Sequence, residues 1–169
     1  MNTAKTPSVS RYASVFRPGL FAEQLHWVTG GGSGIGRCVA HELSALGATV
    51  VISGRKIDKL ERVAAEIAED GGRAICVALD IRDEEQVRIA IAEILAKHGP
   101  IAGLVNNAGG QFPAPLQAIS KRGFDAVVST NLTGGFLMAR EMFVQCMQSH
   151  GGAMVNMAAD MWNGMPGMG

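Results

Sequence analysis

Five glycines fall within seven residues of the segment "VTGGGSGIGR", which runs from Val28 to Arg37. An apolar patch precedes the segment and an amphipathic run follows it, a pattern that indicates a strand, a turn and a helix. The free N–H groups at the start of a helix bind phosphate, and glycines let a pyrophosphate approach the backbone without meeting a Cβ. The segment therefore predicts a phosphate-binding turn.

The spacing of the glycines can be compared with two known phosphate-binding patterns. The order Gly30-x-x-x-Gly34-x-Gly36 is not the literal G-x-G-x-x-G pattern of dinucleotide-binding turns. It does not match the loop of phosphate-transferring P-loop proteins either, because Arg37 and Cys38 stand where that loop needs Lys and Ser or Thr. A cysteine cannot hold magnesium as a hydroxyl does. A glycine turn that binds no ligand is the remaining alternative.

The turn must be positioned by the elements around it, and strands and helices alternate along the chain. Short apolar runs predict strands, and apolar residues at helical spacing predict the helices between them. The alternation indicates an α/β fold, a Rossmann-like doubly wound parallel sheet covered on both faces. We assign residues 25–169 to this dinucleotide-binding domain and residues 1–24 to a loosely held N-terminal arm. The predicted strands are Leu25–Thr29, Thr49–Ser53, Ala74–Leu79, Ile101–Val105 and Ala153–Met157.

A long helical region is predicted between the last two strands, from about residue 123 to residue 149. The pair Gly134-Gly135 predicts a bend inside it. The region is apolar over much of its circumference, with Phe124, Leu132 and Val144 among its apolar residues. Such a helix needs cover on more than one face.

Composition excludes several classes of function. Lys and Arg total 15, as do Asp and Glu, whereas a nucleic-acid-binding surface usually shows a basic excess. No run of eighteen apolar residues predicts a membrane span, and no apolar core of a signal peptide is present, so a cytoplasmic protein is expected. The cysteines Cys38, Cys76 and Cys146 are far apart and odd in number. They predict small buried residues, with no disulfide frame and no metal site.

Four motifs occur in order along the chain. They are Thr29-Gly-x-x-x-Gly34-x-Gly36, Asp80, the "NNAG" that ends at Gly109, and Asn131 in "NLTGGF". In this order they resemble the short-chain dehydrogenase/reductase family. "VTGGGSGIG", "NNAGGQFPAP", "NLTGGF" and "PGLF" are most similar to the branch of peroxisomal trans-2-enoyl-CoA reductase and its bacterial relatives. Some bacterial members of that branch are assigned as citronellol-type dehydrogenases of acyclic terpenoid alcohols.

The resemblance implies which residues bind a nicotinamide cofactor. Asp80 is implied to hold the adenine, with a helix-cap neighbour as the alternative. Asn107 is implied to brace the loop beside the cofactor, which also satisfies loop backbone. Asn131 is implied to be catalytic, as the support of a water-linked proton relay. The implied cofactor-binding set is Gly30, Ser33, Gly34, Ile35, Gly36, Arg55, Asp80, Asn107, Ala108 and Gly109.

The end of the second predicted strand bears on the choice between NAD and NADP. An acid there accepts hydrogen bonds from the ribose 2′-OH of NAD and repels a 2′-phosphate. This chain has Gly54 at that position, followed by Arg55. A guanidinium can bind a 2′-phosphate in a bidentate way, so the sequence predicts NADP(H). A solvated Arg55 at a helix start near Lys56 and Asp58 is the alternative.

The chain departs from the family where the chemistry should lie. Family members usually carry a Ser just after the fifth strand and a Tyr-x-x-x-Lys pair on the next helix, in which Lys lowers the pKa of the proton-transferring Tyr. Here Ala158 and Ala159 follow the strand, the only tyrosine is Tyr12 and the last lysine is Lys121. We therefore expect a chain truncated after the fifth strand. Asp160 is either a polar substitute for the donor or a surface or capping residue.

Three functions remain open at this point. The first is NADPH-dependent hydride transfer to an apolar trans-2-enoyl thioester, which does not need the full alcohol-dehydrogenase triad. The second is oxidation of an apolar terpenoid alcohol, and the third is a truncated, inactive NADPH-binding fragment. The Met-rich tail from Met154 to Met168 either lines an acyl pocket or forms a core cluster or an exposed tail. The resemblance also implies a homo-oligomer formed through the long helix, and a peroxisomal location if the source is eukaryotic.

Overall fold

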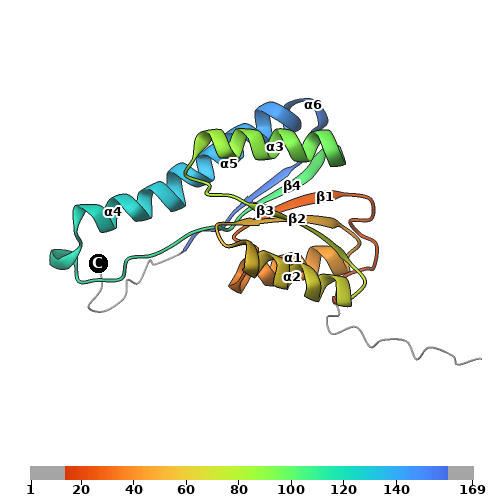
Figure 1. Ribbon diagram of the computed structural model, residues 1–169, viewed down its shortest axis with the longest axis horizontal. Helices are drawn as coiled ribbons and strands as arrows, with labels where there is room; N and C mark the ends of the chain where they lie inside the picture. Colours follow the sequence, from red (N-terminus) through yellow and green to blue (C-terminus); the bar gives the residue numbers. More distant parts are fainter. Residues whose placement is uncertain (1–13, 160–169) are drawn as a thin grey trace, which may run out of the picture.

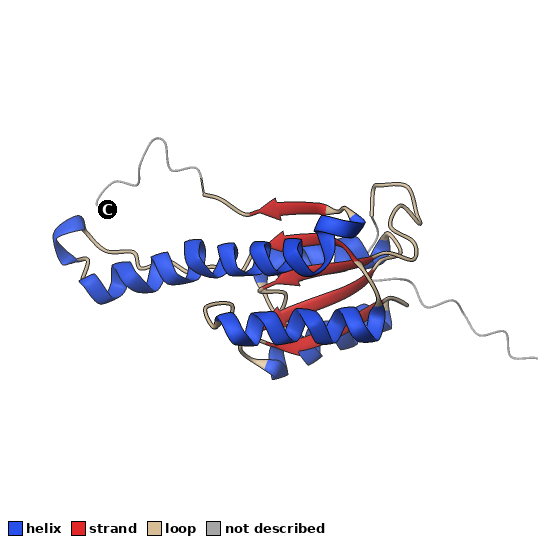
Figure 2. Ribbon diagram, turned by 90° about the horizontal axis from the view of Figure 1, so that it is seen from above, coloured by secondary structure: helices blue, strands red, loops and turns tan. Residues whose placement is uncertain are grey.

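Five short segments form one sheet in the computed structural model, which describes residues 14–159. Every neighbouring pair of strands is parallel, and the strand order is β3-β2-β1-β4-β5. Figure 2 shows the strand arrows pointing in one direction. The predicted parallel sheet is therefore confirmed. The strands are β1 (Leu25–Thr29), β2 (Thr49–Gly54), β3 (Arg73–Ala78), β4 (Ile101–Asn106) and β5 (Ala153–Asn156).

Helices cover both faces of the sheet, as the alternation predicted. One face carries α1 (Gly34–Ala45) and α2 (Ile57–Glu69), and the other carries α3 (Glu84–His98) and the long helical region (Figure 1). Each of the first three helices connects two consecutive parallel strands, which is the βαβ arrangement. The short 3₁₀ helix η1 (Leu116–Ala118) lies in the loop after β4.

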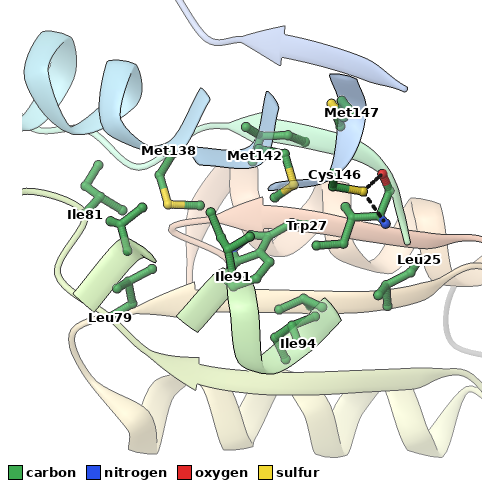
Figure 3. Packing of buried hydrophobic residues seen from close by; sticks show 14 residues of the cluster. Leu25, Trp27, Leu79, Ile81, Ile91, Ile94, Met138, Met142, Cys146 and Met147 are labelled. Carbon is green, nitrogen blue, oxygen red and sulfur yellow. Dashed lines mark hydrogen bonds between the residues drawn. The ribbon is translucent and has the colours of Figure 1, made fainter. Parts of the chain in front are cut away.

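An apolar cluster lies on each face of the sheet, so successive residues of the central strands are buried on alternate sides and the strands are largely apolar. Trp27 and Val28 are neighbours on β1, and their side chains alternate between the two faces of the sheet. Trp27 is fully buried in the cluster on the side of α3, and its indole N–H donates to Ser53 Oγ at 2.9 Å. Val28 is fully buried in the cluster on the side of α1 and α2. Figure 3 shows the first cluster, which gathers residues from β1, α3 and the long helical region.

The long helical region begins at Lys121 and continues to His150. It consists of α4 (Lys121–Val128), a π-helical segment η2 (Ser129–Gly134), α5 (Gly135–Met142), a second π-helical segment η3 (Phe143–Met147) and α6 (Gln148–His150). The bend predicted near Gly134 and Gly135 corresponds to the end of η2, not to a break. Both glycines have helical backbone angles, with φ of −62° in each. We call Ser129–Gly134 the π turn.

One side of this helical region packs on the sheet and the other is uncovered. Met138 and Met142 are fully buried in the first cluster. Five large apolar side chains of the region are exposed, with between 51% and 69% of their surface accessible. These are Phe124, Leu132, Phe136, Phe143 and Val144. This side has no cover among residues 14–159, so the need for cover on more than one face stays a prediction.

The prediction that the three cysteines are buried holds for one of them only. The cysteines were predicted to be small buried residues, but Cys38 is exposed and Cys76 is half-buried. Cys146 is buried, and the Ile101 backbone N–H donates to its Sγ at 3.3 Å. Within residues 14–159, no helix is long and apolar enough to cross a membrane, and no cluster of His, Cys, Asp and Glu is arranged to hold a metal ion.

Part of the N-terminal arm lies within the described residues. The Phe21 backbone N–H donates to the Leu46 carbonyl at 2.9 Å, just before the strand β2. The Phe21 side chain packs against the second apolar cluster. This portion of the arm, residues 14–24, is thus attached to the turn between α1 and β2.

Candidate functional site

A cleft of about 450 Å³ opens at the carboxyl ends of the parallel strands. It lies where the chain order reverses, because β2 and β3 follow on one side of β1 while β4 and β5 lie on the other. Open α/β sheets bind their ligands at such a reversal point. Most of the predicted cofactor residues line it: Gly30, Ser33, Arg55, Asp80, Asn107, Ala108 and Gly109.

The glycine turn packs too closely to accept side chains at two positions. Gly30 has a φ of +69°, which favours glycine, and its N–H donates to the Ser53 carbonyl at 2.8 Å. A Cβ on Gly36 would lie 2.4 Å from both Asn107 Nδ2 and the Gly30 carbonyl oxygen. These glycines let the turn fold back on the first turn of α1. The backbone N–H groups at the helix start are thereby presented at the edge of the cleft.

The N-terminus of α1 has no side-chain cap from its N-cap residue. Ser33 is the N-cap residue, but its hydroxyl makes no capping hydrogen bond, and the first turn contains no acidic residue. Gly34 has open space around it, and Ile35 is 60% exposed in the first helical turn. Neither lines the cleft, so their roles as cofactor residues stay predictions that rest on their backbone N–H groups. A helix start of this kind suits an anion.

Thr29 braces the other wall of the cleft, although the sequence assigned it no role of its own. Its Oγ1 accepts hydrogen bonds from the backbone N–H groups of Asn107 and Ala108, both at 2.9 Å. The Asn107 side chain returns a hydrogen bond from Nδ2 to the Thr29 carbonyl at 2.9 Å. The end of β1 and the turn after β4 are therefore held together by three hydrogen bonds. This role becomes visible only in the structure, where β1 pairs with β4.

Asn106, the residue before Asn107, connects β4 to two neighbouring elements. Its Nδ2 donates to the Gly135 carbonyl and to Asn156 Oδ1, both at 3.0 Å. It thus ties β4 to α5 and to β5. Its own Oδ1 is buried and has no hydrogen-bond partner among the described residues.

Basic residues collect at the end of the cleft beside β2. Arg55, Lys56 and Lys59 line it, and none of the three forms an ion pair with any residue between 14 and 159. Gly54 stands in place of an acid at the end of β2, as the sequence indicated. This corner of the cleft therefore carries three basic side chains that have no ion-pair partner among the described residues.

Asp80 faces the same corner but is engaged by a neighbour. Arg82 Nε lies 2.9 Å from Asp80 Oδ1, and Arg82 Nη2 lies 2.5 Å from Oδ2. The hydrogen bonds from the Arg82 side chain lower the pKa of Asp80 below its usual 3.8; the Arg82 backbone N–H and the charge of Arg55 act in the same direction, against partial burial. A carboxylate offers about four acceptor positions, and Arg82 makes four hydrogen bonds to this one, so a ligand amino group would have to replace part of the ion pair. The sequence did not indicate this ion pair.

Asn131 contacts the loop after β4. Its Nδ2 donates to the Gly110 carbonyl at 2.7 Å, and its Oδ1 accepts from the Gly110 N–H at 2.8 Å. The side chain that was predicted to support a proton relay thus holds the Gly109–Gly110 backbone. Its neighbour Thr130 lines the cleft. The catalytic role of Asn131 remains a prediction.

Several predicted features cannot be placed. Tyr12, Asp160 and the tail from Met161 onward lie outside the described residues. Ala158 and Ala159 follow β5 and are exposed, and Met157 is 45% exposed. The described residues near the end of β5 therefore include no hydroxyl or phenol at the place where the family resemblance leads one to expect a serine.

Comparison with known proteins connects this geometry to one family. The model of the short chain dehydrogenase family matches residues 24–166. The peroxisomal 2,4-dienoyl-CoA reductase of Danio rerio is 32% identical over 152 residues, which cover 89% of this chain and 51% of the relative. A probable 2,4-dienoyl-CoA reductase of Bacillus subtilis (strain 168) is 32% identical over 78% of this chain and 52% of that protein. The chain thus spans about half the length of these curated relatives.

Solved structures give the same fold. A citronellol catabolism dehydrogenase of Pseudomonas aeruginosa PAO1 is 62% identical, with a TM-score of 0.87 over 92% of this chain and 64% of that one. A metagenomic short-chain oxidoreductase in complex with NADP is 33% identical, with a TM-score of 0.77 over 83% of this chain and 64% of that one. The cleft described above lies within the matched part of the chain.

Proposed function

The chain belongs to the short-chain dehydrogenase family, and we propose that its cleft binds NADP(H) for hydride transfer to or from an apolar substrate. Members of this family are oxidoreductases, so the class of reaction follows from membership. The choice of NADP(H) over NAD(H) and the identity of the substrate are our proposals. The observation that supports the cofactor choice most directly is the unpaired basic corner at the end of β2.

The residues of the cleft fit such a cofactor. The uncapped start of α1, with the Ser33 hydroxyl free of a capping bond, suits the pyrophosphate. Asp80 would accept a hydrogen bond from the adenine amino group in place of part of its ion pair with Arg82. We propose that Arg55, with Lys56 and Lys59 beside it in the cleft, binds the 2′-phosphate. A bound nicotinamide would supply or accept the hydride.

The chain's own residues would hold the reacting ring in place. Thr29 fixes the turn of Asn107 and Ala108 through its hydroxyl, and Asn131 fixes the next residues through Gly110. The turn and the loop are therefore rigidly attached to β1 and to the π turn. We propose that this rigid wall orients the nicotinamide, and that Asn131 contributes to proton transfer through the same loop.

Two apolar substrates are supported by different observations. An acyclic terpenoid alcohol is favoured by the 62% identity to the citronellol catabolism dehydrogenase, against 32% to the dienoyl-CoA reductases. An enoyl thioester is favoured by the names of those reductases and by Ala158 and Ala159, which cannot donate the hydrogen bond of a serine. We place the terpenoid first, which reverses the order that the sequence suggested. Formation of NADPH from citronellol, measured beside oxidation of NADPH by a trans-2-enoyl-CoA, separates the two.

The uncovered apolar side of the long helical region supports a homo-oligomer. Large side chains such as Phe136 and Leu132 are more than half exposed there. Contiguous exposed apolar surface on a protein commonly marks an interface. We propose that a second copy of the protein covers this side.

A substitution at Arg55 tests the cofactor assignment. Arg55→Ala is expected to weaken NADPH binding by about 10- to 100-fold, since a bidentate charged contact is lost, and to leave NADH binding nearly unchanged. Isothermal titration calorimetry of the unmodified chain and of Arg55→Ala, each with NADPH and with NADH, measures these affinities. The matched control is Arg62→Ala, which removes the same charge from the exposed side of α2 and outside the cleft. An unmodified chain that prefers NADH contradicts the proposal.

A further inference from the structure

A short turn carries Asp80 at the adenine end of the cleft. This turn, Leu79–Arg82, follows β3, and we call it the adenine turn. The Leu79 N–H donates to the Gly54 carbonyl at 3.0 Å, and the Arg82 N–H donates to Asp80 Oδ1 at 3.1 Å. These bonds fix the turn to the end of β2 and to itself. They do not fix it to the opposite side of the cleft.

Ile81 makes that second attachment. It lies between Asp80 and Arg82, but its side chain is only 6% exposed and belongs to the cluster on the side of α3. Figure 3 shows it beside Met138 of α5. Ile81 is therefore inserted into the core and keeps only a small exposed part at the cleft, which its two charged neighbours also line.

The place where Ile81 inserts is the bare backbone of Gly134. A Cβ on Gly134 would lie 2.7 Å from both Cγ1 and Cδ1 of Ile81 and 3.3 Å from the Ile81 carbonyl oxygen. Real Cβ atoms do not approach other carbon atoms so closely, because cores are close-packed. Ile81 can thus hold its position only because residue 134 has no side chain.

Gly134 is the last residue of the π turn, and the same turn holds the other end of the cleft. Asn131 bonds both backbone groups of Gly110, and Thr130 lines the cleft directly. The adenine turn and the loop after β4 are therefore both attached to one six-residue segment. Single π-helical turns inside α-helices are frequent at functional sites.

We propose that Ile81 and Gly134 are positioning residues, whose contact sets the adenine turn at the right distance from the Asn131-held loop so that both ends of the cleft accept one dinucleotide. The identity of the ligand as a dinucleotide rests on the function proposed above. The contact itself is a property of the chain without ligand, and it can be tested without one.

Gly134→Ala tests the contact. The added methyl group must displace Ile81, and with it the adenine turn. We expect the Leu79 and Arg82 amides to exchange hydrogen faster in the ligand-free protein, as measured by NMR or mass spectrometry. We also expect the affinity for NADPH and for 2′,5′-ADP to fall about tenfold in calorimetric titrations, which is typical of coupled neighbours.

A second substitution distinguishes this contact from a general effect on the helix. Ile81→Ala removes the atoms that the new methyl group would meet. The double variant Ile81→Ala with Gly134→Ala is therefore expected to recover slow exchange and tighter binding relative to Gly134→Ala alone. If Gly134→Ala does not fold and the double variant does, the contact is supported in the same way. Equal impairment of the two variants overturns the proposal.

Gly135→Ala is the matched control, since the neighbouring glycine has no atom within 4 Å of a built Cβ. It makes the same change of helix propensity and is expected to leave amide exchange and affinity unchanged. A Gly134→Ala protein that behaves like Gly135→Ala contradicts the inference. If the unmodified chain binds no NADPH, the proposed function fails, while the exchange measurements on the ligand-free variants still decide the inference.

Discussion

The N-termini of α1 and α3 differ in how their free N–H groups are satisfied. At α3, Asp83 is the cap, and its side chain accepts a hydrogen bond from the Gln86 N–H at 3.0 Å. Glu84 and Glu85 add negative charge in the first turn. At α1, Ser33 makes no capping bond and the first turn has no acid. The start of α3 thus has both a side-chain cap and acidic residues, whereas the start of α1 has neither.

This difference favours the start of α1 over that of α3 as the one that binds a ligand. A capped and acidic N-terminus stabilises its helix, because the cap and the charges offset the free N–H groups and the helix dipole. An uncapped N-terminus keeps those groups for an anion. Both helices start at the carboxyl edge of one parallel sheet, so the fold alone does not distinguish them. The residues in the first turn do.

Gly36→Ala is expected to have the largest effect, because it removes the geometry on which the open end of α1 depends. The new Cβ would lie 2.4 Å from Asn107 Nδ2 and from the Gly30 carbonyl oxygen. We expect the free energy of unfolding to fall by about 3 kcal/mol, as for overpacked sites, with loss of NADPH binding. Urea denaturation measures the first effect. Glu85→Ala on α3 is the control, and an equally small change in both variants would show that the glycine turn is not closely packed.

Ser33→Asp makes α1 resemble α3. The added carboxylate should repel phosphate, and we expect NADPH affinity to fall by about tenfold or more. The same charge stabilises the helix start, so the free energy of unfolding should rise by about 0.5 kcal/mol. Calorimetric titration and thermal denaturation of one protein sample give both values. Unchanged NADPH affinity would mean that no phosphate approaches this helix end.

Asp83→Ala makes the converse change at α3 and is expected to have the smallest effect on binding. Loss of the capping bond should lower the free energy of unfolding by about 1 kcal/mol. NADPH affinity should change by less than about threefold, because Asp83 does not line the cleft. Chemical denaturation and titration test the two parts separately. A large loss of NADPH affinity in Asp83→Ala would mean that cofactor binding depends on the start of α3 as well as on the start of α1.

The features that the sequence predicted correctly are those with local signals. The parallel sheet follows from the alternation of apolar runs, and the glycine turn between β1 and α1 follows from its own composition. The pattern of Gly54 and Arg55 also pointed to the basic corner of the cleft. Each of these signals lies within a few consecutive residues.

The features that the sequence missed join residues that are far apart in the chain. Thr29 meets Asn107 and Ala108 only because β1 pairs with β4. Ile81 meets Gly134 only because the adenine turn lies against the π turn. The bend predicted at Gly134 and Gly135 is the end of a π-helical segment, in which both glycines keep helical backbone angles. Cys38 was expected to be buried, although its helix position faces solvent.

The most direct test is a calorimetric titration of the unmodified chain with NADPH and with NADH under the same salt conditions. We propose that the open end of α1 and the basic corner beside β2 together bind a dinucleotide with a 2′-phosphate. Both cofactors are expected to bind, with NADPH tighter by about 10- to 100-fold. Tighter binding of NADH, or no binding of either, would contradict it.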